Sequence, residues 1–184
     1  MNSQSDNDIM LQVRNGDIDK LGLLFDKYHL VLYTFFVRMS SSKATSEDLV
    51  QEVFLRMLKY RYTFRGDGKF TNWMFHIARN AQIDFLRKQS KETCVDDDAL
   101  DTASEDAQPE ELLEQHQNHL LLMQALDKLP HEKREVLILS RFHDMKYEDI
   151  AALMHCQVGT IKARVHRALA ELRTIFNDIS GENG

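Results

Sequence analysis

Proline, glycine and cysteine are all scarce in this chain of 184 residues. Only two prolines and seven glycines occur, which excludes collagen-like, proline-rich and glycine-rich proteins and favours a mostly helical chain. The two cysteines, Cys94 and Cys156, lie far apart, so a disulfide framework is excluded and a reducing compartment is expected. No apolar run approaches the roughly 20 residues of a membrane span, and the polar N-terminus is not a signal peptide. We therefore expect a cytoplasmic protein with no direct membrane insertion.

Charge is distributed unevenly along the chain. Residues 1–88 carry a net charge of +3, residues 89–118 carry −9, and residues 119–184 are balanced. This pattern predicts a mildly basic module, an acidic linker extended by self-repulsion, and a balanced module. Because the total of −6 repels phosphate, we do not expect the chain to bind DNA tightly by itself.

Apolar side chains recur at helical spacing almost throughout, which predicts an all-α fold. We expect two small helical domains, residues 1–90 and 113–184, joined by a flexible acidic linker over residues 91–112. Polar stretches, glycines and Pro130 separate the expected helices, which cover residues 17–38, 46–60, 72–89, 110–129, 132–142, 147–154 and 158–176. Thr71 or Asn72 is expected to cap the third of these helices.

The sharpest pattern is a short helix, a tight break and a longer helix across residues 147–172, which is typical of a helix-turn-helix. The apolar residues expected to form its small core are Ile150, Leu153, Val158, Ile161 and Val165. The opposite face of the longer helix mixes small residues with cations, so it could sink into a major groove. Its candidate DNA contacts are Thr160, Lys162, Arg164, His166 and Arg167. The alternative is an ordinary helical hairpin with a solvated basic face.

The helix expected over residues 72–89 has one cationic, amide-rich face without a carboxylate, beside a loop that carries aromatic residues. Aromatic rings next to amides and arginines suit single-stranded nucleic acid, whose unstacked bases need a stacking surface and hydrogen bonds to their edges. The candidate contacts are Phe64, Trp73, His76, Arg79, Asn80 and Arg87. The alternative is that the aromatic residues belong to the core.

The helix expected over residues 46–60 exposes a leucine within a charged stripe. The stripe contains Asp48, Gln51 and Glu52, with Leu55 among them. An exposed apolar side chain in such a stripe indicates a docking face for a protein partner. The alternative is a solvated face with no partner.

Catalytic and metal-binding patterns are weak. The acidic run 96–98 could hold magnesium, but it lies in the expected linker, where a solvated run is the simpler interpretation. The histidines and Cys156 lack a recognised zinc spacing, and neither a glycine-rich phosphate loop nor a nucleophile elbow occurs. We expect no enzyme, no catalytic residue, no bound metal and no cofactor.

These three segments together resemble an extracytoplasmic-function (ECF) sigma factor of bacterial RNA polymerase, over nearly the full chain. SEDLVQEVFLRMLK (46–59) resembles the helix of sigma region 2 that docks on the clamp coiled coil of the largest polymerase subunit. FRGDGKF and NWMFHIARNAQIDFLRK (64–88) resemble the part that melts and reads the promoter −10 element. LPHEKREVLILSRF and YEDIAALMHCQVGTIKARVHRAL (129–169) resemble region 4, which binds the flap and reads the −35 element.

The resemblance implies a role for each candidate residue. Asp48, Gln51, Glu52 and Leu55 would contact core polymerase. Asn80 would hold a flipped −10 base near the 64–69 loop, and the cations of the last helix would contact the −35 duplex. The acidic linker would thread toward the active-site cleft and the RNA exit channel, and an anti-sigma factor would control the protein.

Two residues depart from the family pattern. His155 stands where the helix-turn-helix usually has glycine, and histidine tolerates the left-handed conformation better than most residues. Ala163 stands where serine is common, which would alter −35 preference. Two alternatives of other classes are a stand-alone regulator that uses only its helix-turn-helix, and a helical adaptor that binds polymerase without reading DNA.

Overall fold

The computed structural model describes residues 4–39, 42–92 and 110–181, and the regular structure within them is entirely helical. The chain divides into two compact units, 1–37 with 41–99, and 38–40 with 100–184. The prediction of an all-α, two-domain protein is thereby confirmed. Most of the expected linker lies outside the described residues, and so does the prediction that it is extended. None of the described helices is both long enough and apolar enough to cross a membrane.

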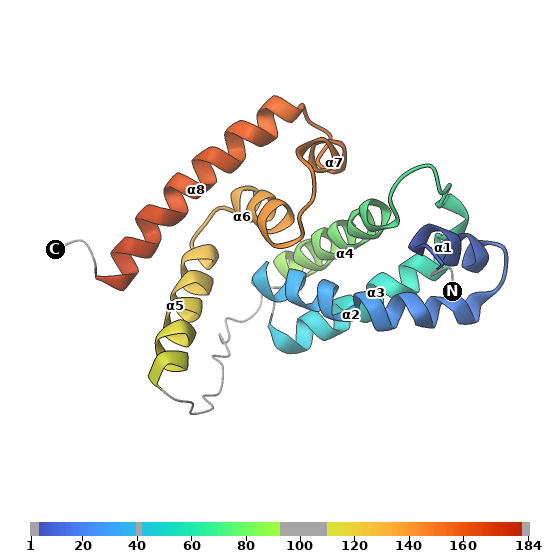
Figure 1. Ribbon diagram of the computed structural model, residues 1–184, viewed down its shortest axis with the longest axis horizontal. Coiled ribbons are helices and arrows are strands. Elements are labelled where there is room, and N and C mark those ends of the chain that lie inside the picture. The colour runs from blue at the N-terminus through green and yellow to red at the C-terminus, as the bar shows by residue number, and fades with distance from the viewer. Residues whose placement is uncertain (1–3, 40–41, 93–109, 182–184) are drawn as a thin grey trace. The chain divides into compact units, whose positions relative to one another are not determined.

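The N-terminal domain packs four α-helices and two 3₁₀ turns (Figure 1). In chain order its elements are α1 (Asp6–Arg14), η1 (Ile18–Lys20), α2 (Leu21–Arg38), α3 (Lys43–Lys59), η2 (Arg61–Thr63) and α4 (Phe70–Glu92). The core is aliphatic and aromatic, and its largest fully buried side chains are Met10, Leu24, Leu32, Phe35, Phe36, Met57, Phe70 and Met74. Helices α3 and α4 pack closely, so the two candidate faces predicted on them belong to one rigid domain.

Helix α1 is the element that sequence analysis missed. Ser5 accepts from the backbone of Asp8 while the Asp8 carboxylate accepts from the backbone of Ser5, so the helix starts with a capping box. Its buried residues are Ile9, Met10 and Val13. A nine-residue helix with three buried positions has too few turns for its apolar spacing to be recognised. The sequence therefore showed only a polar, acidic N-terminus and no helix there.

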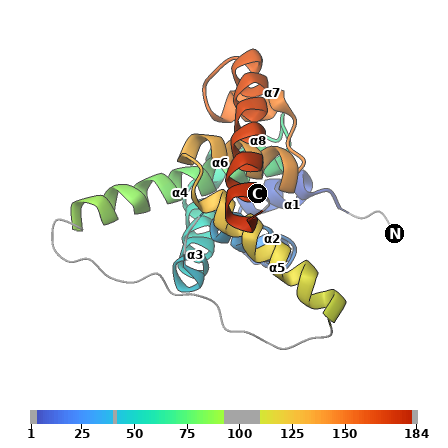
Figure 2. The same ribbon diagram turned by 90° about the vertical axis from the view of Figure 1, so that its left-hand side faces the viewer.

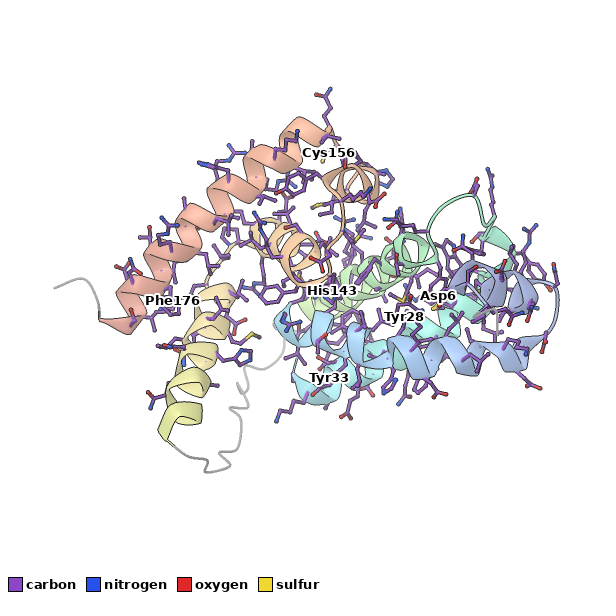
Figure 3. The ribbon with its side chains drawn as sticks, viewed as in Figure 1. Asp6, Tyr28, Tyr33, His143, Cys156 and Phe176 are labelled. Atoms are coloured by element: carbon purple, nitrogen blue, oxygen red, sulfur yellow. The ribbon has the colours of Figure 1, made fainter. Side chains whose placement is uncertain are left out.

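Asp6 fastens α1 to α2. Its carboxylate accepts from the Tyr28 hydroxyl at 2.6 Å and pairs with the Lys27 ammonium at 2.7 Å. Figure 3 shows Asp6 and Tyr28 pointing toward one another. Burial, together with the bond to Asp6, raises the pKa of Tyr28 above its usual value. Tyr28 is therefore a neutral donor locked onto a carboxylate.

The C-terminal domain consists of α5 (Glu110–Asp127), α6 (His131–Leu137), a π-helical turn η3 (Ile138–Phe142), α7 (Tyr147–Leu153) and α8 (Val158–Ser180). Helix α8 packs against α5, α6 and α7, as Figure 2 shows from the side of α8. It runs four residues beyond the expected end, and Gly181 then terminates it in the left-handed conformation. The helix-turn-helix of α7 and α8 thus rests on α5 and α6.

Arg134 closes the turn between α5 and α6. The guanidinium is buried and donates to the backbone carbonyls of Leu126 at 2.7 Å, of Leu129 at 3.1 Å and of Asp127. These carbonyls belong to the C-terminal end of α5 and the turn that follows, where helical partners run out. Sequence analysis did not predict that Arg134 is buried and bonded to three carbonyls.

Candidate nucleic-acid and polymerase interfaces

The candidate docking residues of α3 share its solvent face. Asp48, Gln51 and Leu55 are exposed, and the Leu55 side chain is 63% exposed. Because a helix turns about 100° per residue, Asp48, Glu52 and Leu55 lie within one narrow arc. The structure therefore brings the predicted stripe together as an apolar centre within a polar rim. We call these four residues the α3 face.

Arg56 prearranges one member of the α3 face. It donates to Glu52 at 2.6 Å and to Asp84 of α4 at 2.7 Å. Burial alone would lower the pKa of Arg56, but its bonds to the two carboxylates raise it. Arg56 thus holds the Glu52 carboxylate in place, and it also ties α3 to α4. Sequence analysis did not find this bridging role of Arg56.

The candidate residues of α4 lie on its outward side. Asn80 and Arg87 are exposed, whereas His76 and Arg79 are half-buried. Figure 2 shows the end of α4 extending beyond the other helices of its domain, and side chains 86–91 there are exposed. Arg87 therefore lies on a helix end that is open to solvent, and Asn80 lies two turns nearer the domain. We call these four residues the α4 face.

Phe64 does not fit its predicted role as a stacking surface for bases. The side chain is only 3% exposed, and its ring packs 5.2 Å from Trp73 and 6.2 Å from Phe70. Burial of a phenyl ring is more favourable than its exposure to water. The buried ring therefore anchors the 64–69 loop to the core of the domain. Trp73 is half-buried, and its Nε1 donates to Thr63 at 3.2 Å. Of the candidate aromatics, only Trp73 keeps part of its ring accessible.

Helix α4 also begins at a different residue from the one expected. Phe70 is its first residue, so Thr71 and Asn72 lie inside the helix rather than at the cap. The Phe70 backbone N–H donates instead to the side chain of Asn7, at 2.9 Å. A cap supplied from 63 positions away carries no local sequence signal, which explains the error.

The turn between α7 and α8 is a Schellman motif. The Cys156 N–H donates to Ala151 at 3.0 Å and the His155 N–H donates to Ala152 at 3.4 Å. His155 has φ +53°, as expected for a residue that replaces glycine. Figure 3 places Cys156 in this turn. Of the expected core, Ile150, Leu153, Ile161 and Val165 are buried, whereas Val158 is half-buried.

Helix α8 presents most of its candidate residues to solvent. Thr160, Lys162, His166 and Arg167 are exposed. Arg164 is half-buried and pairs with Glu132 of α6 at 3.2 Å, so it is already engaged within the domain. The other four are exposed on the outward side of the first three turns. We call them the α8 face.

Metal chemistry finds no support among the described residues, where no group of His, Cys, Asp or Glu side chains is arranged to hold an ion. The acidic run 96–98 lies outside those residues.

Two protein-family models match segments of this chain. Sigma-70 region 2 matches residues 24–92, and Sigma-70 region 4 matches residues 119–172. The first match contains the α3 and α4 faces, and the second contains the helix-turn-helix. Helix α1 precedes the first match.

Curated relatives and solved structures point the same way. The chain is 34% identical over 156 residues to the ECF RNA polymerase sigma factor SigX of Bacillus subtilis, covering 82% of this chain and 80% of SigX. It is 28% identical over 173 residues to the ECF RNA polymerase sigma-E factor of Escherichia coli K12, covering 89% and 90%. The structure of the sigma factor RpoE of Bartonella quintana with the anti-sigma factor NepR matches with a TM-score of 0.67 and 26% identity, covering 85% of this chain and 96% of that one.

A helical protein with these two domains is a transcription initiation factor of the sigma-70 class rather than an enzyme. More narrowly, the chain belongs to the ECF RNA polymerase sigma factors. The family expected from the sequence is thereby confirmed. The fold of CnrH, solved with the cytosolic domain of CnrY, also matches, with a TM-score of 0.72 at 21% identity over 95% of this chain and 99% of CnrH.

Proposed function

We propose that this sigma factor binds core RNA polymerase through the α3 face, reads the unpaired −10 strand with the α4 face, and reads the −35 duplex with the α8 face. The observation that carries the proposal is the exposure of the three faces on three helices. Each face combines residue types suited to its target. The protein would act in the cytoplasm, where its polymerase and promoter lie.

The α3 face suits a protein partner. Leu55 is 63% exposed within a rim of Asp48, Gln51 and Glu52, and such apolar centres with polar rims are typical of protein interfaces. Acidic side chains on the rim favour a basic partner surface and disfavour nucleic acid. The clamp coiled coil of the polymerase is the partner that the family resemblance implies.

The α4 face suits an unpaired strand. Asn80 offers both a donor and an acceptor to a base edge, and Arg79 and Arg87 offer charge to phosphates. Asp84 borders this face one turn after Asn80, where Arg56 binds its carboxylate. Trp73, with part of its ring accessible, is the candidate stacking surface.

The α8 face suits a major groove. Gly159, Ala163 and Ala170 are small and exposed, which allows close approach, and Arg167 lies near the centre of the outward side. The net charge of −6 makes the whole chain a weak DNA binder on its own. Polymerase would hold both domains on one promoter, so that each gains from effective concentration.

An anti-sigma factor is the third partner we propose. Solved relatives of similar fold were obtained as complexes, RpoE of Bartonella quintana with the anti-sigma factor NepR among them. A protein that hides the α3 face or the α8 face would block polymerase or promoter binding. Pull-down with the full chain, followed by competition with core polymerase, would identify such a partner.

Run-off transcription tests the proposal as a whole. Purified core polymerase is mixed with the full chain on a library of promoters, and selected transcripts define the −10 and −35 sequences. We expect initiation only with both components present. Promoter binding by the chain alone would favour a stand-alone regulator, and polymerase binding without initiation would favour an adaptor.

Charge reversal tests the α3 face. Asp48→Arg with Glu52→Arg should weaken core polymerase binding by about 2–5 kcal/mol if the contact is desolvated. The matched control is Asp19→Arg with Asp26→Arg, which makes the same charge change at exposed positions elsewhere. Co-elution with core polymerase is the measurement. Equal retention of both double variants would remove the α3 face from the interface.

Asn80→Ala tests the α4 face. Loss of its amide should make the free energy of open-complex formation less favourable by about 1–3 kcal/mol, by analogy with bidentate base contacts. Polymerase binding should not change. Permanganate footprinting of unpaired thymines is the measurement, and co-elution with core polymerase is the control. Normal melting in this variant would contradict the role.

A further inference from the structure

Asn7 makes three hydrogen bonds to the 64–69 loop and its junction with α4. Its Nδ2 donates to the carbonyls of Gly68 at 2.7 Å and of Gly66 at 3.3 Å. Its Oδ1 accepts from the Phe70 N–H at 2.9 Å. One amide side chain therefore ties down both glycine peptides of the loop and caps the helix that carries the α4 face.

Two further residues of α1 hold the same loop. The Arg14 guanidinium donates to the Phe64 carbonyl at 3.1 Å. Gly66 has φ +79°, and a Cβ placed there would lie 3.1 Å from Leu11 Cδ1, so the loop backbone packs directly on the Leu11 side chain. Asn7, Leu11 and Arg14 are spaced i, i+4 and i+7, which places them on one face of α1. Figure 1 shows α1 beside this loop.

The other side of α1 is anchored firmly. Met10 and Val13 are fully buried, and Asp6 binds Tyr28 and Lys27 of α2. Helix α1 therefore connects a rigid core on one side with the loop on the other. A loop whose carbonyls are already bonded loses less conformational freedom when it receives a ligand.

We propose that Asn7 is a positioning residue, which holds the 64–69 loop in the conformation that receives the unpaired −10 strand. The inference rests on the proposed −10 role of this domain. Asn7 does not itself touch DNA in this proposal. It acts through the two glycine carbonyls and the first turn of α4, while the exposed Asp67, Gly68 and Lys69 face the strand.

Three variants of the full chain, each assembled with core polymerase, test the proposal. Asn7→Ala removes all three bonds. Asn7→Asp keeps an acceptor for the Phe70 N–H but loses both donors, so it separates capping of α4 from holding of the loop. Gln12→Ala is the matched control, because it removes an amide from the opposite side of the same helix.

The probe is a fluorescent single strand that carries the non-template −10 sequence selected by run-off transcription. We expect Asn7→Ala and Asn7→Asp to bind it about ten-fold more weakly, the equivalent of one lost oriented contact, and to lose base preference near the loop. Binding to a −35 duplex and to core polymerase should stay unchanged. Amide hydrogen exchange of residues 66–70 should be faster in both variants than in the wild type. Within this segment the Phe70 amide should exchange more slowly in Asn7→Asp than in Asn7→Ala, because the carboxylate still accepts its N–H.

Strand binding and base preference equal to those of Gln12→Ala would overturn the proposal. An equal loss of −35 and polymerase binding would also overturn it, because Asn7 would then support the whole domain. If Asn7→Ala does not fold, Gly66→Ala disturbs the packing of the same loop on Leu11 of α1 and should give the same selective loss. Failure of the wild-type holoenzyme to prefer the −10 strand would instead refute the proposed function.

Discussion

The two candidate DNA-reading elements are built in opposite ways. The 64–69 loop and the start of α4 are held by a side chain that lies 59 to 63 positions earlier in the sequence. The turn before α8 is held by backbone bonds that span three and five positions, from His155 to Ala152 and from Cys156 to Ala151. One element depends on a distant helix, and the other is nearly complete within its own segment.

This difference explains where sequence analysis succeeded. A local motif expresses its geometry in neighbouring residues, so the helix-turn-helix, its left-handed residue and most of its core could be predicted. A loop stabilised from a distance shows only its own glycines and aromatics. The same reasoning predicts that the loop is sensitive to changes in α1, whereas the helix-turn-helix tolerates changes outside its domain.

The largest expected effect tests how strongly contacts within the C-terminal domain stabilise it. Arg134→Met removes the donor from three backbone carbonyls around the turn after α5, and should lower the free energy of unfolding of this domain by about 3–5 kcal/mol. Lys133→Met is the control, since its half-exposed pair with Glu171 should contribute at most about 1 kcal/mol. Amide hydrogen exchange in α6 and α8 is the measurement. Equal protection in both variants would contradict the role of Arg134.

Tyr28→Phe tests the anchoring of α1 on α2. Loss of the bond to Asp6 should lower the free energy of unfolding by about 1.5–3 kcal/mol near neutral pH. The fluorescence of Trp73, the single tryptophan, measures unfolding. Burial and the bond to Asp6 raise the pKa of Tyr28 in the folded state, so the unfolded state loses this proton first. Stability should therefore be complete below about pH 10 and fall as the pH rises above it.

The pH dependence supplies its own control. The difference in unfolding free energy between wild type and Tyr28→Phe should shrink as the pH rises above about 10, because the Tyr28 hydroxyl ionises first in the unfolded state of the wild type and Tyr28→Phe has no such proton. A constant difference across these pH values would show that the bond to Asp6 does not depend on the tyrosine proton.

Arg167 and Lys162 test whether the locally built α8 face separates specificity from affinity. Arg167→Ala should relax preference at one or two −35 positions and cost about 1–3 kcal/mol on the preferred promoter. Lys162→Ala, on the flank, should weaken all promoters alike and reduce the salt slope by about one unit. A randomised −35 library with holoenzyme at two salt concentrations is the measurement. The reverse pattern would mean that the helix docks in a rotated orientation.

The smallest expected effect concerns the turn itself. His155 adopts φ +53°, so His155→Gly should relieve backbone strain and stabilise the C-terminal domain by up to about 1 kcal/mol. Urea-dependent hydrogen exchange in α7 would measure the change, with His166→Gly in mid-helix as a destabilising control. A loss of stability in His155→Gly would mean that the imidazole makes a contact worth more than the strain.

Sequence periodicity by itself determined that this protein is helical and that α3, α4 and α8 each present a distinct face, because these features depend on spacing along one helix. The charge distribution along the chain indicated two modules with an acidic stretch between them. Family motifs in the same segments determined the class of protein. The family assignment was confirmed by relatives that cover most of the chain.

Only the tertiary structure decided which side chains on those segments are available. Phe64 proved to be buried, Arg164 is paired with Glu132 of α6, and Arg56 is paired with Asp84 of α4. It also decided that Asn7 caps α4 and holds the 64–69 loop. The physical reason is that burial, ion pairing and capping here join residues from different helices, and no pattern within one segment records which distant partner it will meet.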